Sequence, residues 1–142
     1  MRILLSVGFG GFIGSILRYL CSIALNKIII SNFPIGTLFV NVAGCFLIGL
    51  LINNNYQVAN ISINEFLIIG LLGGFTTFST FSLETYKLIN SGLVQTAILY
   101  ISLSMLLGLI AIYISSNFNN NFWGRLILHV KYFFIFKFIL RQ

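Results

Sequence analysis

Acidic side chains are nearly absent from this sequence of 142 residues. It contains no aspartate, two glutamates (Glu65 and Glu84) and one histidine, His129. Metal centres and general acid–base pairs need several such side chains at matched spacing, so an enzyme is not expected. Charge of either sign is also scarce, because 7% of the residues are charged where a soluble domain carries about a quarter.

Two further features argue against other classes of protein. Cys21 and Cys45 both lie in apolar runs, where cysteine is a small packing residue more often than half of a disulfide or metal site. The net charge is +6, but half of the eight lysines and arginines follow residue 124 and the others are scattered. We therefore expect a solvated or lipid-facing basic tail and no nucleic-acid partner.

Long apolar runs make up most of the chain, with 58% hydrophobic residues and a mean hydropathy of +1.03. A soluble domain of this size could not bury that surface, so we predict an all-α membrane protein with one domain. A spanning helix needs about 20 mostly apolar residues. The sequence predicts four, over residues 3–25, 35–52, 66–86 and 93–114. The first lacks a signal-peptide cleavage site and is interpreted as a retained span.

The third span does not read as a continuous helix. The stretch GGFTTFSTFSLE, residues 73–84, combines two glycines with five hydroxyl residues. Glycine weakens a helix and hydroxyls compete for its backbone, so we predict that the third helix is broken in mid-membrane. A break frees carbonyls that suit a cation and amides that suit an anion. It is therefore a candidate ion site.

Small or polar residues recur on one face of each of the other spans. They are Gly8, Gly11, Ser15, Arg18 and Ser22 in the first, Thr37, Asn41, Gly44 and Ile48 in the second, and Tyr100, Ser104, Gly108 and Ala111 in the fourth. Such faces let membrane helices approach closely, and tight packing is sufficient to explain them. Phe78 and Phe81 also fit ordinary packing. Packing is the plainer interpretation of such a pair, and their positive ring edges amid hydroxyl donors add a weaker indication of a lining for a small anion.

Four segments carry a family resemblance: GGFIGSILRY, GTLFVNVAGCFLIG, GLLGGFTTFSTFSLE and YISLSMLLGLIA. In this order they resemble the small bacterial fluoride channels called Fluc or CrcB, and the third segment is the most specific. The resemblance implies passive fluoride export across the bacterial inner membrane, which lowers fluoride toxicity in the cytoplasm. It also implies an antiparallel, dual-topology dimer in the lipid bilayer, with two fluoride paths and one structural sodium ion on its two-fold axis.

The resemblance assigns roles to individual residues. The fluoride-path positions correspond to Asn41, Phe78, Ser79, Thr80, Phe81, Tyr100 and Ser104. The sodium ion would be bound by the main-chain carbonyls of Gly73 and Thr76 from both subunits. Arg18 and Glu84 match vestibule or support positions. For these two, snorkelling of Arg18 to the interface and pairing of Glu84 with Lys87 are the plainer alternatives.

The C-terminal residues depart from the family. We predict a four-helix domain over residues 1–121 and a basic, aromatic tail over 122–142, of the kind found in interfacial segments. Without the tail, the basic residues barely distinguish the two sides of the membrane, as in a dual-topology homodimer. Counting the tail shifts the bias towards both termini inside, which leaves a fixed orientation with a homologous partner as an alternative to the expected homodimer.

Two other functions stay open at this level. A small multidrug-type exporter is also a four-helix dual-topology dimer, but its exchange chemistry depends on an acidic residue in the first helix, and residues 3–25 contain none. A non-transporting membrane assembly subunit would explain the small faces of the helices. It would leave the hydroxyl-rich break without a purpose.

Overall fold

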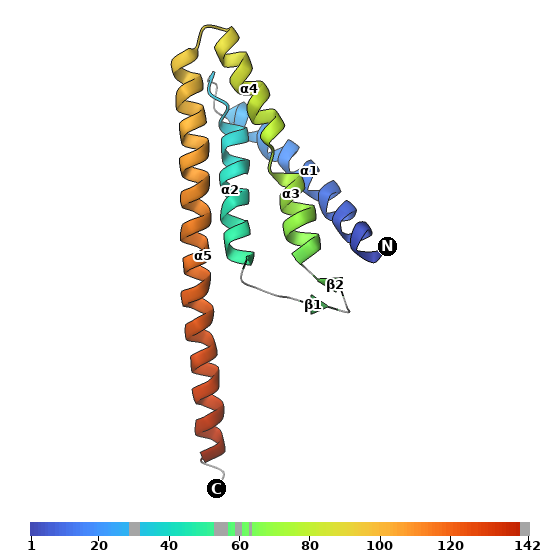
Figure 1. The fold of residues 1–142 in the computed structure, drawn as a ribbon, viewed down its shortest axis with the longest axis vertical. Helices are drawn as coiled ribbons and strands as arrows, with labels where there is room; N and C mark the ends of the chain where they lie inside the picture. Colours follow the sequence, from blue (N-terminus) through green and yellow to red (C-terminus); the bar gives the residue numbers. More distant parts are fainter. Residues whose placement is uncertain (29–31, 53–56, 59–60, 63, 140–142) are drawn as a thin grey trace.

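The structure, a computed structural model, describes residues 1–28, 32–52, 57–58, 61–62 and 64–139, with side chains at 1–27, 32–52 and 64–118. Figure 1 shows its helices in chain order and labels the α-helices; η1 directly precedes α3. The helices are α1 (Arg2–Ile28), α2 (Ile35–Leu51), the π-helix η1 (Glu65–Leu72), α3 (Gly73–Phe75), α4 (Phe78–Asn90) and α5 (Val94–Ile139).

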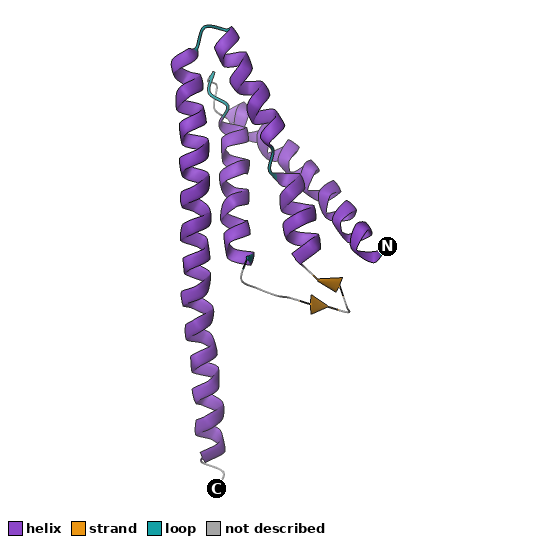
Figure 2. Ribbon diagram, in the orientation of Figure 1, coloured by secondary structure: helices purple, strands orange, loops and turns teal. Residues whose placement is uncertain are grey.

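Two short strands lie between α2 and η1, a feature that the all-α prediction did not include. β1 (Gln57–Val58) pairs antiparallel with β2 (Ile61–Ser62), with Val58 opposite Ile61. Each strand contains a β-branched residue, the type that favours extended backbone. They form a connection outside the helices, so the membrane-sized elements remain helical (Figure 2).

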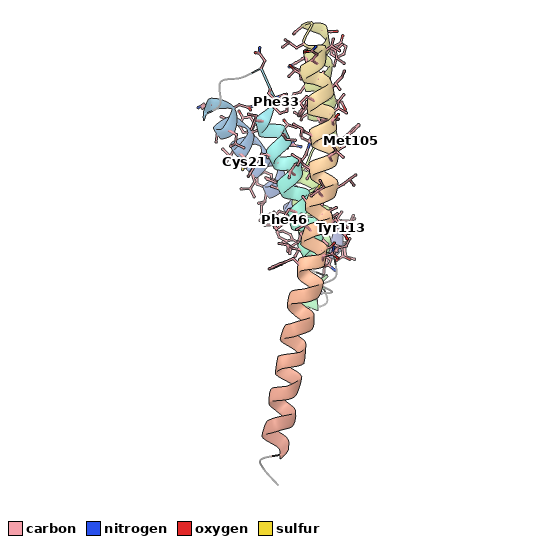
Figure 3. All side chains as sticks on the ribbon, turned by 90° about the vertical axis from the view of Figure 1, so that its left-hand side faces the viewer. Cys21, Phe33, Phe46, Met105 and Tyr113 are labelled. Atoms are coloured by element: carbon pink, nitrogen blue, oxygen red, sulfur yellow. The ribbon has the colours of Figure 1, made fainter. Side chains whose placement is uncertain are left out.

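Three helical segments of the described part are long and apolar enough to cross a membrane: Arg2–Lys27, Glu65–Asn90 and Val94–Phe118. The fourth apolar helix, α2, has 17 residues and a length of about 26 Å, slightly below the about 30 Å hydrocarbon core. Large apolar side chains are exposed along these helices, among them Met105 (61%) and Tyr113 (70%) on α5 (Figure 3). An apolar exterior of this kind identifies a membrane protein.

Helical backbone is interrupted between α3 and α4, inside the predicted third span. Thr76 has φ −83° and ψ 159°, and Thr77 has φ −153° and ψ 124°, so both residues are extended. Figure 2 shows this segment as a short loop between two helices. Thr77 also starts the next helix, because its Oγ1 accepts a hydrogen bond from the Thr80 N–H at 3.2 Å.

Glycines set how closely α1 approaches η1 and α3. A methyl group at Gly10 would lie 2.5 Å from the Phe66 carbonyl, and one at Gly74 would lie 2.6 Å from the Gly11 carbonyl. Gly11 of the predicted small face lies in this seam, although a methyl on Gly11 itself would lie at an ordinary 3.8 Å from the Gly70 carbonyl, and Gly10 was not on that face. Gly8 is exposed, with no atom of the described chain within 4 Å of such a methyl, so the single chain does not test the predicted face at this position. Backbone contact replaces side-chain packing along this seam.

The last two helices differ in how they end. α4 ends at a left-handed Gly92 (φ 77°), after which the Leu93 N–H bonds the Leu88 carbonyl at 2.9 Å, so the chain reverses into α5. α5 has 46 residues, about 69 Å, and extends beyond the bundle (Figure 1). The predicted fourth span ended at residue 114 and the predicted tail began at 122. The helix continues through both positions, so the short Asn-rich stretch between them lies within α5.

Candidate functional site

A pocket of about 290 Å³ lies beside the interruption, and we call it the interruption pocket. Its lining comes from Asn41, Cys45 and Ile48 of α2, Thr76 and Thr77 of the interruption, Phe78 and Phe81 of α4, and Ser104 and Met105 of α5. Three helices and the extended segment thus converge on one space. It contains both phenylalanines and the asparagine that the sequence singled out.

Asn41 holds the interruption in place through both ends of its amide. Its Oδ1 accepts a hydrogen bond from the Thr77 N–H at 2.8 Å, and its Nδ2 donates to the Thr77 carbonyl at 3.0 Å. Thr77 is 8% exposed, so these backbone groups have no water to replace a lost partner. One of the two Nδ2 hydrogens is used in this way, and a second donor remains on the amide.

The hydroxyls around Thr77 form a local network. Its Oγ1 lies 3.2 Å from the Ser79 Oγ and 3.1 Å from the Thr80 Oγ1. Ser79 and Thr80 are not among the residues that line the interruption pocket. In this structure they stabilise the start of α4.

The two phenylalanines of α4 differ in their surroundings. Their ring centroids are 5.7 Å apart, and the Phe81 ring also contacts the fully buried Tyr100 ring at 5.1 Å. Phe78 is 76% exposed although it borders a pocket that contains polar groups. A single chain therefore leaves one wall of this pocket open.

Ser104 supplies an unused hydroxyl to the same pocket. Its Oγ is buried and has no hydrogen-bond partner among the described residues. Buried polar groups are paired in the great majority of cases, so an unpaired one in a pocket is a candidate ligand contact.

Glu84 is held by two hydroxyl donors from other helices. The Thr37 hydroxyl donates to its Oε1 and the Tyr100 hydroxyl to its Oε2, both at 2.8 Å. Within the described side chains, Glu84 makes no ion pair with Lys87. The plainer alternative for Glu84, a surface ion pair with Lys87, is therefore absent from the described side chains. Thr37 and Tyr100 are buried, which places this carboxylate against the bundle interior.

A second, larger pocket of about 670 Å³ opens at the end of the bundle where α4 turns into α5, and we call it the end pocket. Its lining includes Asn26 of α1, the loop residues 32–34, and Glu84 and Lys87 of α4. Glu84 borders the end pocket, while its partner Tyr100 stacks on Phe81 of the interruption pocket. The Glu84–Tyr100 pair therefore stands between the two pockets.

The carbonyls proposed for sodium are released from the helical hydrogen-bond ladder. In a continuous helix the Gly73 carbonyl would accept from Thr77 and the Thr76 carbonyl from Thr80. Those N–H groups instead bond Asn41 and the Thr77 hydroxyl. Carbonyl oxygens are ligands of hard cations, so the donor type fits. Two such oxygens from one chain are too few to complete a cation site.

Arg18 is directed to the same interruption. Its Nη1 lies 3.5 Å from the Thr76 carbonyl, which is a long hydrogen bond from a cationic donor. The guanidinium thus supports the extended segment. It also competes with a sodium ion for one of the two carbonyls, that of Thr76. This contact agrees with the support position that the family resemblance implied for Arg18, and it directs the guanidinium to the interruption.

Three residues of the site had no assigned role in the sequence analysis. Thr77 was one of five hydroxyls there, although a threonine just before a helix and three residues before Thr80 is a helix-capping pattern. Thr37, one turn before Asn41, was placed only on a packing face. Cys45 lines the interruption pocket, one turn after Asn41, and no local pattern distinguished it from a packing cysteine.

The fold and the pockets define a small helical membrane protein whose interrupted helix borders a space lined by amide, hydroxyl and aromatic groups. Interrupted helices of this kind form ion and substrate sites in membrane proteins. The family model described as CrcB-like protein, Camphor Resistance (CrcB), matches residues 5–116. The chain belongs to this CrcB-like family.

Curated relatives carry a common functional name. A protein of Flavobacterium psychrophilum named fluoride-specific ion channel FluC is 44% identical over 113 residues, covering 78% of this chain and 91% of the relative. Proteins with the same name from Ruminiclostridium cellulolyticum (48% over 102 residues, 70% and 78%) and Shewanella frigidimarina (46% over 116 residues, 80% and 93%) are also similar.

Proposed function

We propose that this protein is a passive, fluoride-selective ion channel that lets fluoride leave the cell and so lowers its toxicity in the cytoplasm. The relatives' shared name and the family membership support the activity. The observation that carries the site is the interruption pocket, where the unpartnered Ser104 hydroxyl and the phenyl rings of Phe78 and Phe81 border one space.

The chemistry of these groups suits a small anion. Fluoride is strongly hydrated, so its path must replace water with close donors. The Ser104 hydroxyl, the second amide hydrogen of Asn41 and the positive edges of the two rings are donors without full charge. An uncharged lining of this kind binds an anion weakly enough to release it. Ser79 and Thr80 are included in the proposed path because they belong to the hydroxyl network beside the pocket. Tyr100 is included because its ring contacts that of Phe81.

The open wall at Phe78 supports a dimer. A ring that is 76% exposed next to polar groups would put that polar space against lipid in a monomer. We infer an antiparallel dimer in which a second subunit closes the pocket, with the interruption at mid-membrane. The Gly73 and Thr76 carbonyls of both subunits would then make four ligands for a structural sodium ion, which would join the subunits at the interruption.

The orientation in the inner membrane follows from the basic residues. Arg2 lies at the same end of the bundle as the α5 extension, which carries Arg125, Lys131 and Lys137 (Figure 1). Lys27 and Lys87 lie at the other end. This bias favours cytoplasmic termini. A strictly oriented chain would need an inverted homologue as its partner, whereas a weakly oriented chain would form the homodimer.

Growth in fluoride tests the activity in cells. A bacterium that lacks its own fluoride exporter should regain growth in millimolar fluoride when it expresses this chain. Phe81→Ile should abolish the rescue, while Phe12→Ile, at an exposed ring on α1, should preserve it. Absence of rescue by a chain that is present in the membrane, alone and with an inverted homologue, would overturn the proposal.

A further inference from the structure

We propose that Lys87 is the anion-recruiting residue of the channel, which raises the local fluoride concentration in the end pocket. This inference rests on the proposed function and adds a specific residue at the mouth of the path. Lys87 makes no contact with the interruption pocket. It lines a pocket of about 670 Å³ together with Asn26, Asn32 and Ser91, which are neutral hydrogen-bonding side chains.

The position of Lys87 sets it apart from the other cations. The basic residues with described side chains are Arg2, Arg18, Lys27 and Lys87. Of these, only Lys87 lines either the end pocket or the interruption pocket. Lys27 lies at the same end of the bundle, in the last turn of α1, but does not line the end pocket.

The charge of Lys87 is available because its natural partner is engaged elsewhere. Glu84 lies three residues earlier on α4, a spacing at which helical ion pairs form. Its two oxygens instead accept hydrogen bonds from Thr37 and Tyr100, both at 2.8 Å. No ion pair within 4.0 Å joins Glu84 and Lys87 among the described side chains. The ammonium group is therefore free to act on mobile ions in the pocket.

The negative charge of Glu84 is a second reason to expect a cation that attracts anions in the end pocket. Its carboxylate borders the end pocket on the route to Phe81 and would by itself repel an approaching anion. A lysine one turn away, further toward the bundle end, offsets that charge and attracts anions into the space. Charges that line a cleft raise the local concentration of ions of opposite sign, and the effect falls with ionic strength.

Ionic strength provides the readout that separates recruitment from a structural role. Fluoride efflux is measured from liposomes containing the full chain at roughly 10 mM and roughly 150 mM total salt, where the screening length falls from about 30 Å to about 8 Å. The added salt is potassium gluconate, and valinomycin balances the charge. The variants are Lys87→Gln, Lys87→Arg and the matched control Lys27→Gln.

The expected result is a salt-dependent loss. At low salt Lys87→Gln should slow efflux by about two- to fivefold, and at high salt it should approach the unmodified rate. Lys87→Arg and Lys27→Gln should match the unmodified chain under both conditions. Equal rates of Lys87→Gln and the unmodified chain at low salt, or an equal loss at both salt levels, would overturn the inference. Failure of the unmodified chain to move fluoride would instead overturn the proposed function.

Discussion

Replacing Asn41 by leucine should release the extended segment between α3 and α4 from its hydrogen bonds to α2. The substitution keeps the size of the side chain and removes both hydrogen bonds to Thr77, at 2.8 and 3.0 Å. Interhelical hydrogen bonds in membrane proteins contribute about 0.6–1.7 kcal/mol each. Two of them give an expected loss of about 1–3 kcal/mol in the free energy of unfolding, because the buried backbone of Thr77 gains no other partner.

The assay is unfolding of the purified protein in micelles by increasing SDS, followed by far-ultraviolet circular dichroism. Asn117→Leu is the matched control, because Asn117 is exposed on α5 and its side chain makes no hydrogen bond with the described residues. Asn41→Leu should also slow fluoride efflux at least tenfold, since the pocket wall moves with the interruption. Equal stability of the two leucine variants would refute the conclusion that Asn41 holds the interruption in place.

Three further predictions concern packing, the Glu84 network and the tail. Gly44→Ala should stop efflux because its methyl group would collide with the Thr76 side chain, whereas Gly8→Ala should be neutral, with nothing within 4 Å; wild-type efflux in Gly44→Ala would contradict the close packing. Tyr100→Phe should cost about 1–2 kcal/mol in SDS unfolding and slow efflux, because Glu84 loses one donor; an unchanged midpoint would argue against that bond. Deletion of residues 122–142 should preserve efflux, since the family match ends at residue 116; loss of efflux from a folded dimer would place the tail in the channel.

Local sequence patterns predicted the features that depend on local chemistry. The hydroxyl-rich stretch around Thr77 indicated where regular helix is disfavoured, and the apolar runs located the helices to within a few residues at most ends. Asn41 was placed on the polar face of its helix, and the structure pairs its amide with the backbone of Thr77.

Contacts between residues that lie far apart in the sequence could not be predicted. The partner of Asn41 is the backbone of Thr77, 36 residues away, and no spacing rule connects them. The convergence of Thr37 and Tyr100 on Glu84 likewise requires three helices in fixed register. The close contact at Gly10 was not predicted because helical periodicity gives a face of α1 but not the depth at which the neighbouring helix crosses it. The continuation of α5 past residue 114 shows that a fall in hydropathy does not by itself end a helix.

Selective fluoride permeation through the purified protein is the most direct test of the proposed channel activity. Liposomes loaded with potassium fluoride or potassium chloride are diluted into impermeant salt, valinomycin is added, and anion efflux is followed with ion-selective electrodes. A fluoride-selective channel should give rapid fluoride efflux without chloride efflux, and Phe81→Ile should abolish the fluoride efflux. Chloride efflux as fast as fluoride efflux, or no fluoride efflux from folded dimers of this chain or of this chain with an inverted homologue, would contradict it.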